Sequence, residues 1–438
     1  MRARFLKGTV PFMFDAIVIG ARAAGSTTAM LLARAGVDVL VVDRARFPSD
    51  TLSTHQLQVP AVARLRRWGL LDRVASGTPA TRRVRFDQGV VLEGAWPEHD
   101  GIDALYSPRR TVLDKILVDA AREAGAEVRE SFPVDEILFS DGHVGGIRSR
   151  DRKEHAPLVI GADGRHSLLA KAVTPEAYDV RPALTCAYYT YWDGVPMQAG
   201  EMYGRPGRAI GAWPTNDGLT MTYVAAPIAE FATARKNIEA HILAALDQAG
   251  DLGERVRAGR RAERLYGTAD LANRFHVPYG PGWALVGDAG LTLDPVTGQG
   301  IGDAFRDAES LAQAIVDGRP LSDYQRARDK ATKPMYELTA QVAKFEPPPP
   351  AFLEALEGRP EKITRFLGVL AGITPATPRN MGKIAGLRAT LKLLKAQAQG
   401  SGARTRISSR SGTSTVRSSP PALYSTVSVR SDVSEPGS

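Results

Sequence analysis

The chain has 438 residues, of which 43% are hydrophobic and 24% are charged, and its formal net charge is +8. These values are ordinary for a soluble globular protein and leave room for two or three structural units. No apolar run approaches the roughly 18–20 residues of a transmembrane helix. The single cysteine, Cys186, excludes an intramolecular disulfide and a two-cysteine redox relay.

The positive charge is concentrated at the two ends of the chain. Residues 1–13 carry three basic residues and no acidic one, and residues 398–438 carry five arginines against two acidic residues, so the ends account for six of the eight positive charges. We therefore expect no nucleic-acid partner. No apolar signal segment follows the basic N-terminus, and one cysteine suits a reducing compartment, so we expect a cytoplasmic location.

A strand–turn–helix–strand unit is predicted between residues 14 and 44. The apolar run 16–19 indicates a buried strand, residues 23–35 a helix, and residues 37–42 a second strand. The turn from Gly20 to Gly25 has Arg22 where the dinucleotide-binding pattern G-x-G-x-x-G has its second glycine. Asp43 follows the second strand, where it can accept hydrogen bonds from ribose hydroxyls. The unit favours dinucleotide binding over a plain packing unit, with a helix N-terminus facing a pyrophosphate.

Further elements follow in an order that mixes strands and helices. Residues 44–55 are a polar, proline-interrupted loop. Helices are predicted at 57–71, 110–121, 228–249 and 302–317, with further helical segments to about 395. Strands are predicted at 82–95, 126–129, 134–139, 143–148 and 158–160, in a tyrosine- and tryptophan-rich region from 181 to 226, and at 283–286. Beyond residue 399 the Ser/Arg-rich composition predicts disorder.

Three of the apolar strands end in turns that contain glycine, two of them with aspartate, at residues 20–25, 161–167 and 287–301. An Asp-Gly pair by itself suits any tight turn. The carboxyl ends of parallel strands meet at one edge of a sheet, however, so the three turns can surround one ligand. Together they resemble the fingerprints of FAD-dependent monooxygenases of the para-hydroxybenzoate hydroxylase type. We name them the ADP turn (20–25), the DG turn (161–167) and the GD turn (287–301).

The resemblance covers residues 14–345, and the arginine-containing ADP turn is similar to that of a bacterial branch of FAD-dependent oxidoreductases. It implies an α/β fold, with a Rossmann-like FAD-binding domain of the glutathione-reductase type, an inserted mixed β-sheet substrate domain and C-terminal helices. The expected division is an N-terminal extension at 1–13, FAD-binding parts at 14–76, 105–180 and 269–340, substrate-domain strands at 77–104 and 181–268, C-terminal helices at 341–398 and a disordered tail at 399–438. A start of translation at Met13 instead of Met1 is compatible with this division.

The resemblance also implies how the protein holds FAD. Asp43, with Arg44 beside it, would bind the adenosine ribose, and the amides of residues 23–25 would face the pyrophosphate. Val134 would lie on the strand that lines the adenine. Arg110 would contact the FAD phosphate or ribityl, the alternative being a surface arginine.

The other two turns would bind the remainder of the cofactor. Asp163 would serve both FAD and NAD(P)H indirectly, Asp288 would bond the ribityl chain, and the amides of residues 298–301 would meet the flavin pyrimidine. We expect the Arg22 side chain to point out of the ADP turn, toward the flavin side or solvent, which leaves the backbone amides free. The complete set of expected cofactor-binding residues is Gly20, Arg22, Ala23, Ala24, Gly25, Asp43, Arg44, Arg110, Val134, Asp163, Gly164, Gly287, Asp288, Pro295, Gly298, Gln299, Gly300 and Ile301.

The reaction that the resemblance implies is monooxygenation. NAD(P)H would reduce FAD, and O2 would then form a flavin C4a-hydroperoxide that hydroxylates or epoxidises a small aromatic, polyketide or similar substrate. A geranylgeranyl-reductase-like enzyme, which reduces double bonds, has the same three turns and is the main alternative. A halogenase is less favoured because its Trp-x-Trp-x-Ile-Pro signature is absent, and a flavin-free binding protein recruited through the basic tail is least favoured.

The substrate side offers four candidate residues: His55, Tyr189, Tyr191 and Trp213. The aromatic residues could line a substrate or simply belong to the core. His55 could assist proton transfer or only hydrogen-bond within its loop. No metal cluster and no nucleophile–base pair is evident, and the catalytic acid and base, the choice between NADH and NADPH, and the oligomeric state stay open.

Overall fold

The computed structural model of the protein describes residues 13–53 and 55–385. The predicted extension before Met13 and the predicted tail from residue 399 lie outside the described residues. The helical segments predicted up to residue 395 are described only as far as residue 385.

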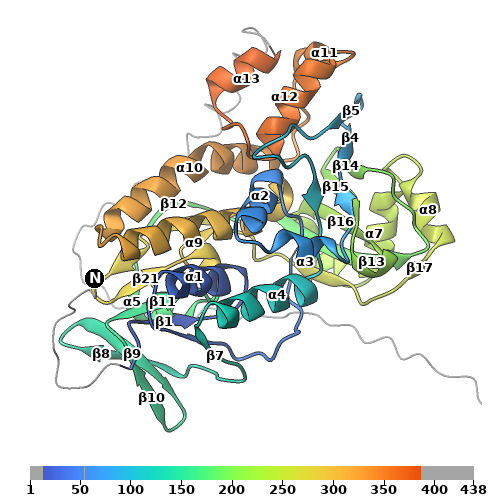
Figure 1. Ribbon diagram of the computed structural model, residues 1–438. Coiled ribbons are helices and arrows are strands. Elements are labelled where there is room, and N and C mark those ends of the chain that lie inside the picture. The colour runs from blue at the N-terminus through green and yellow to red at the C-terminus, as the bar shows by residue number, and fades with distance from the viewer. Residues whose placement is uncertain (1–12, 54, 386–438) are drawn as a thin grey trace, which may run out of the picture.

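A six-stranded sheet with the order β20-β21-β11-β1-β2-β7 lies in the lower part of Figure 1. Its strands are β1 (Ala16–Ile19), β2 (Val39–Val42), β7 (Glu127–Arg129), β11 (Leu158–Gly161), β20 (Tyr279–Gly280) and β21 (Trp283–Leu285). All neighbouring strands are parallel except β20 and β21. The carboxyl ends of β1, β11 and β21 therefore meet at one edge, as the sequence predicts.

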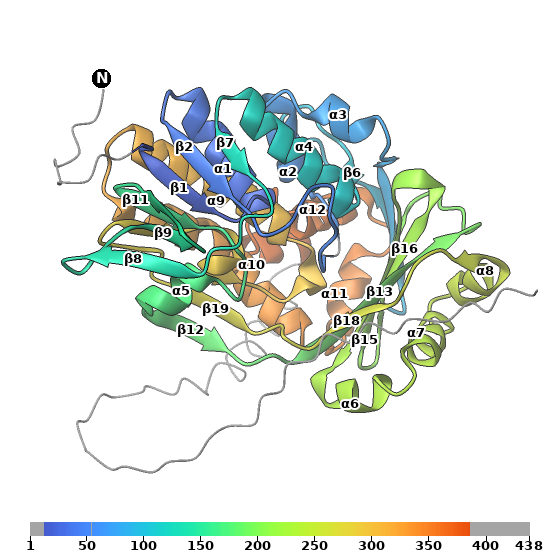
Figure 2. The same ribbon diagram turned by 90° about the horizontal axis from the view of Figure 1, so that it is seen from below.

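Side chains of this sheet alternate between two apolar layers, because successive residues of a strand point to opposite faces. Val18 and Ile160 pack into the layer formed with helices α1, α4 and α9, whereas Ile17 and Val159 pack against strands β8 and β9. These flanking elements are α1 (Ala23–Arg34), α4 (Arg110–Glu123), α9 (Gly300–Val316), β8 (Glu136–Ser140), β9 (His143–Ser149) and β10 (Arg152–His155). Figure 2 shows α1 and α4 on one side of the sheet and β8 on the other.

A second, eight-stranded sheet has the order β17-β13-β16-β15-β14-β4-β5, with β18 paired to β13. Its strands are β4 (Arg83–Asp87), β5 (Val91–Ala95), β13 (Thr185–Asp193), β14 (Gly200–Arg205), β15 (Arg208–Pro214), β16 (Thr220–Pro227), β17 (Arg260–Arg261) and β18 (Tyr266–Thr268). β14 and β4 are parallel and the other pairs are antiparallel, so this is the mixed sheet that the resemblance implies.

The two faces of the second sheet have different partners. One face carries Tyr188 and Trp192 and packs with residues of α7 (Ile238–Leu246) and α8 (Leu252–Ala258). The opposite face carries a second buried cluster, which we name the tyrosine face: Ala187, Tyr189, Tyr191, Trp213, Met221, Tyr223, Ala225 and Leu271.

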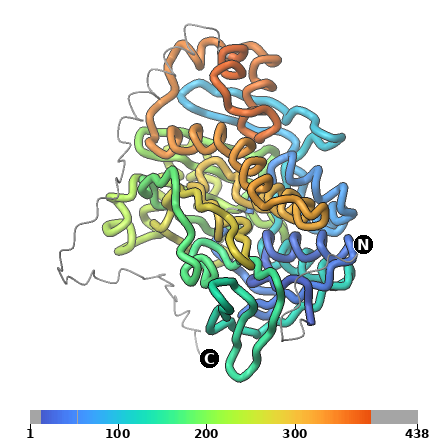
Figure 3. Tube along the Cα trace, turned by 90° about the vertical axis from the view of Figure 1, so that its left-hand side faces the viewer, coloured from blue at the N-terminus to red at the C-terminus, as the bar shows by residue number. Residues whose placement is uncertain are grey.

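Smaller elements connect the two sheets and extend the molecule toward the C-terminus. The short strands are β3 (Ala80–Thr81) with β6 (Leu105–Tyr106), and β12 (Ala177–Arg181) with β19 (Asn273–His276) and β22 (Leu291–Thr292). The remaining helices are α2 (Val59–Arg67), α3 (Leu71–Ala75), α5 (Leu168–Val173), α6 (Phe231–Ala234), α10 (Leu321–Val342), α11 (Pro350–Leu356), α12 (Pro360–Leu370) and α13 (Pro378–Ala385). In Figure 3, the C-terminal helices and the strands β8–β10 lie at opposite ends of the molecule.

The prediction of a single helix at residues 228–249 is wrong. Residues 228–230 form a 3₁₀ turn, and the helices α6 and α7 are separate. The break occurs at Asn237, whose Oδ1 accepts a hydrogen bond from the amide of Ala240 at 3.0 Å. Asparagine at this position is a preferred N-cap and starts a new helix. Within the described residues, no helix is both long and apolar enough to cross a membrane.

Candidate functional site

The three turns contact one another through their backbones. A Cβ atom at Gly20 would lie 2.6 Å from the carbonyl oxygen of Ala162 in the DG turn, and one at Gly25 would lie 1.8 Å from the carbonyl oxygen of Gly20. A Cβ atom at Gly287 would lie 2.8 Å from Cβ of Ala24. Side chains would hold these segments apart, so glycine brings the three turns together around the same space.

Helix α1 presents its N-terminus at this junction. Ser26 bonds back to the carbonyl of Arg22 at 2.9 Å and continues the helical pattern. The amides of residues 23–25 precede it, and the first amides of a helix have no acceptor within that helix. They carry the partial positive charge of the helix dipole, which is suited to a phosphate.

Asp43 ends β2 beside the ADP turn. Its side chain accepts hydrogen bonds from the amides of Ala21 and Ala45, both at 2.7 Å. These bonds fix the carboxylate against the turn, and each oxygen keeps a lone pair for a further donor such as a ribose hydroxyl. Arg44 next to it is exposed.

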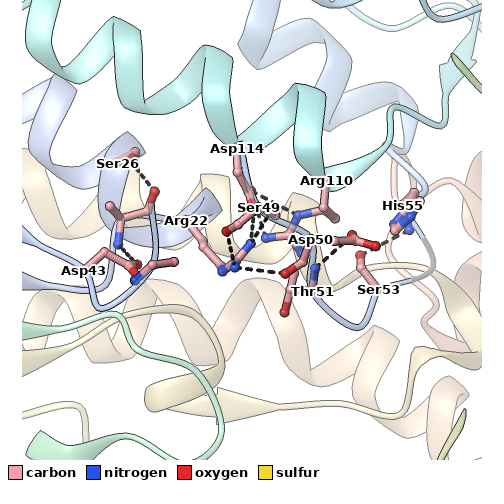
Figure 4. Close-up of polar contacts among 12 residues, drawn as sticks. Arg22, Ser26, Asp43, Ser49, Asp50, Thr51, Ser53, His55, Arg110 and Asp114 are labelled. Carbon is pink, nitrogen blue, oxygen red and sulfur yellow. Dashed lines mark hydrogen bonds and ion pairs between the residues drawn. The ribbon is translucent and has the colours of Figure 1, made fainter. Parts of the chain in front are cut away.

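Arg22 points out of the ADP turn, as expected from the sequence. Its guanidinium donates to Asp114 at 2.7 Å, to the carbonyl and hydroxyl oxygens of Ser49 at 3.2 and 2.9 Å, and to the carbonyl of Asp50 at 3.0 Å. Figure 4 shows these bonds on the side of the turn away from Asp43. Arg22 therefore binds the loop that follows Asp43 and leaves the pyrophosphate position to the backbone amides.

Asp114 joins Arg22 to Arg110. It is fully buried in helix α4, and one oxygen accepts from Nε and Nη2 of Arg110 at 3.0 and 2.9 Å. Arg110 is therefore not a surface residue, since only 8% of it is exposed. Two guanidinium groups share one carboxylate, so the cluster carries a net positive charge beside the three turns, where an anionic group would be stabilised.

The DG turn holds a carboxyl group that is only partly satisfied. Oδ2 of Asp163 accepts from the amide of Leu168 at 2.7 Å, whereas Oδ1 is buried without a partner among the described residues. Burial raises the pKa of Asp163, and the nearby charge of Asp43 raises it further. Asp163 and Asp43 thus lie close together, and Oδ1 is open to an additional hydrogen-bond donor.

The GD turn lies against Gln56, which directly follows the loop of residues 44–55. Asp288 is 43% exposed at its side chain and lies 3.8 Å from Arg165 of the DG turn. Gly298 has φ +64°, and a Cβ atom there would be 2.5 Å from Oε1 of Gln56. Pro295 belongs to a 3₁₀ turn that ends at Gly298, and helix α9 begins at Gly300.

His55 bridges the loop and the tyrosine face. It is fully buried, and its Nε2 hydrogen-bonds to the hydroxyl of Tyr191, while its Nδ1 has no partner among the described residues. Burial, followed by the charges of Arg110 and Arg109, lowers the pKa of His55 to about 3. The imidazole is therefore neutral, and the interpretation that His55 bonds only within its loop is wrong.

The aromatic candidates differ in their contacts. The hydroxyl of Tyr189 lies 3.4 Å from both the carbonyl of Thr51 and the amide of Ser53, so it packs under the loop. Only 5% of Trp213 is exposed, and its Nε1 has no hydrogen-bond partner in the described part of the chain. All three aromatic candidates belong to the tyrosine face.

Val134 is placed differently from its prediction. It lies in the segment before β8, which begins at Glu136, and not on a strand. Neighbouring Phe132 donates its amide to the carbonyl of Asp43 at 2.8 Å, so this segment still runs beside the end of β2. Asp135 still donates its amide to the carbonyl of Arg148 at 2.8 Å, so the backbone pairing of this strand begins directly after Val134.

Several residues of the site were not identified from the sequence. Asp114 could have been identified from the sequence as a partner of Arg110, because it follows Arg110 at the helical i,i+4 spacing. Tyr266 stacks on Tyr189 with a ring separation of 4.6 Å, and Arg109 lies 4.9 Å over the Tyr191 ring. These contacts depend on how the strands are paired, and no pattern in the sequence indicates them.

The residues present fit FAD. The glycines let the backbones of the three turns approach one another, and the first amides of α1 suit a pyrophosphate. Asp43 and Asp163 can each accept a further hydrogen bond from a hydroxyl group. The positive Arg22–Asp114–Arg110 cluster lies beside the same turns. No group of three potential metal-ligating side chains occurs among residues 13–53 and 55–385.

Comparison with known proteins identifies a family and several relatives. Residues 13–318 match the protein family described as "FAD binding domain". The chain is 26% identical to the menaquinone reductase of Mycolicibacterium smegmatis over 75% of this chain and 83% of that protein. It is also 26% identical to digeranylgeranylglycerophospholipid reductase 1 of Methanopyrus kandleri, over 82% of this chain and 99% of that protein.

Among solved structures, the chain is similar in fold to the flavin-dependent brominase Bmp2. The TM-score is 0.73 over 88% of this chain and 99% of the brominase, with 18% sequence identity. At this identity the likeness concerns the fold alone. The match extends through both sheets and confirms the expected architecture.

Proposed function

The chain belongs to the FAD binding domain family, the flavoproteins similar to para-hydroxybenzoate hydroxylase, and on this premise we propose that it is an FAD-dependent monooxygenase. It would use NAD(P)H and O2 to insert one oxygen atom into a small, conjugated organic substrate. The observation that carries the proposal is the His55–Tyr191 pair, which links the loop at the three turns to the tyrosine face.

The FAD site follows from the residues at the three turns. The amides of residues 23–25 would bind the pyrophosphate, Asp43 the ribose, and the turn at residues 298–301 the pyrimidine end of the flavin. When bound, the flavin supplies the redox chemistry, and the protein supplies position and excludes water.

The substrate would lie between the GD turn and the tyrosine face. This face is composed of aromatic and other apolar side chains, and its Tyr189 and Tyr191 are each at most 5% exposed. Such a surface suits a flat, conjugated molecule better than a charged one, because no solvent remains to stabilise charge.

His55 and Tyr191 would move a proton for this substrate. His55 is neutral, and burial raises the pKa of Tyr191, with Tyr189 and Asp50 raising it further. Both shifts keep the pair uncharged at rest, so one proton lies in the hydrogen bond between the tyrosine oxygen and Nε2 of the imidazole. The partnerless Nδ1 is a second position at which that proton can enter or leave.

Reduction of a carbon–carbon double bond is the second candidate function. It is favoured by the reductase from Methanopyrus kandleri, which is related over 99% of its length. The same His55–Tyr191 pair would then donate a proton to the reduced bond. The hydroxyl-rich tyrosine face argues for the first candidate, since an aliphatic lipid chain gains nothing from phenol groups.

The mass of the product separates the two functions. FAD-loaded protein is incubated with NAD(P)H and a library of conjugated compounds, once in air and once without oxygen. The first candidate predicts products heavier by one oxygen atom and formed only in air. Products heavier by two hydrogens, formed equally without oxygen, would contradict monooxygenation and support the reductase.

A further inference from the structure

Four residues lie side by side in one row across the eight-stranded sheet. Tyr189 of β13 is in register with Tyr266 of β18 on one side and with Tyr223 of β16 on the other. Tyr223 is in turn in register with Gly211 of β15. Because residues opposite one another in antiparallel strands point to the same face, all four lie on the side of the sheet that carries the tyrosine face, to which Tyr189 and Tyr223 belong.

The loop satisfies the phenols at the β18–β13 end of this face. Tyr266 donates to Oδ2 of Asp50 at 3.0 Å, and the Tyr189 hydroxyl lies 3.4 Å from the Thr51 carbonyl. Tyr191, one position along the same face, bonds to His55. Each phenol that these two strands place on this face therefore has a partner.

The next two strands carry hydrogen-bond donors without partners. The hydroxyl of Tyr223 on β16 and Nε1 of Trp213 on β15 are both buried, and neither has a partner in the described part of the chain. Both residues are 5% exposed. A buried donor without a partner costs about 1–3 kcal/mol, and two neighbouring ones on a single face indicate that something else supplies the acceptor.

The indole of Trp213 is oriented with its nitrogen edge on the side of strand β16. The ring lies over Gly211, where a Cβ atom would be 2.6 Å from Cη2 of the indole. Its Cε3 edge is directed to Gly200 of β14, at 3.7 Å from the corresponding position. Nε1 lies on the opposite edge of the ring, so it is directed to β16, the strand of Tyr223.

The electrostatic surroundings select a neutral acceptor. Burial raises the pKa of Tyr223 well above its usual value, and Asp294 and Cys186 add to the effect, so this hydroxyl keeps its proton. The ionisable groups that act on Tyr223 are the acid Asp294, which precedes the 3₁₀ turn that ends at Gly298, and the thiol of Cys186. An anionic ligand would lack a counter-charge here, whereas a carbonyl oxygen accepts two hydrogen bonds without one.

We propose that Tyr223 Oη and Trp213 Nε1 form a donor pair that binds a carbonyl oxygen of the substrate, which is thus a neutral, flat, conjugated ketone or quinone-type compound. The inference rests on the proposed function for the location of the substrate. It adds a recognition subsite on β15 and β16, beyond the reach of the loop that holds the other phenols.

A pair of matched probes tests the subsite. 9-Fluorenone and fluorene have the same fused rings, and only fluorenone has a carbonyl oxygen. Their dissociation constants are measured with oxidised, FAD-loaded protein in the absence of NAD(P)H, so no turnover is involved. Tyr223→Phe and Trp213→Phe are each expected to weaken fluorenone binding about 5- to 10-fold, the value of one hydrogen bond, and to leave fluorene binding unchanged.

Tyr188→Phe is the matched control, because its hydroxyl is also buried without a partner in the described part of the chain but lies on the opposite face of the sheet. It should leave both dissociation constants unchanged, and unaltered flavin content shows that each variant is folded. The proposal is overturned if the wild-type protein does not bind fluorenone, or if the Tyr223 variant weakens both probes equally or neither. A protein that binds fluorenone selectively but forms no oxygenated product would contradict the proposed function and leave the subsite intact.

Discussion

Gly25→Ala is expected to weaken FAD binding by about 100-fold or more. The new Cβ atom would lie 1.8 Å from the carbonyl oxygen of Gly20 and 3.1 Å from Cβ of Ala162, so the start of helix α1 must move away from Gly20 and the ADP turn must open. Overpacking of this kind costs about 1–3 kcal/mol or more, and a 100-fold change in affinity corresponds to about 2.8 kcal/mol. The flavin content of the purified protein and a titration with FAD measure the effect.

Gly302→Ala is the matched control for this substitution. Gly302 lies in helix α9, and a Cβ atom there would be 3.6 Å from Cβ of Ala61, an ordinary contact. Alanine is also the better helix former, so this variant should retain FAD. If Gly25→Ala bound FAD as tightly as Gly302→Ala, the close packing of helix α1 on Gly20 within the ADP turn would not be needed for the cofactor.

Tyr191→Phe is expected to lower turnover about 100-fold while flavin content stays unchanged. The substitution removes the hydroxyl that bonds to Nε2 of His55, and loss of a positioned proton donor typically costs 10²–10⁴-fold in rate. Turnover is measured with whichever compound the product assay identifies. Because burial lowers the pKa of His55 to about 3, the wild-type rate should show no acid limb near the usual histidine pKa of about 6.5.

Tyr188→Phe serves as the control for Tyr191→Phe. Tyr188 is on the same strand but points to the opposite face, where it packs with Phe231 and His241. Its hydroxyl is remote from His55, so turnover should not change. Equal losses in the two variants would mean that Tyr191 acts only through the stability of the sheet.

The three glycine turns and their meeting at one edge of the sheet were predictable from the sequence because their signals are local. A strand, a glycine turn and a helix lie within one short segment of chain, and each of the three turns is such a segment. Even Arg22, which departs from the glycine pattern, has the orientation expected of it, since its guanidinium bonds to Asp114 and Ser49 and not to the turn.

The substrate side was only partly predictable because its contacts depend on register. Tyr189 and Tyr223 are distant in the sequence and become neighbours only through the pairing of β13 with β16. The partnership of His55 with Tyr191 spans 136 residues and joins a loop to a sheet. Aromatic composition indicated that this sheet is buried, whereas the hydroxyls with and without partners could be sorted only from the structure.

The most direct test of the central claim is to identify the flavin that the protein retains. We propose that the ADP turn binds the adenylate half of the cofactor, with Asp43 at its ribose, so the purified protein should be yellow and release about one FAD per chain on denaturation. After removal of the flavin, the protein should rebind FAD and discriminate strongly against FMN, which lacks the adenylate. A colourless protein that does not take up added FAD, or one that binds FMN equally well, would contradict the account.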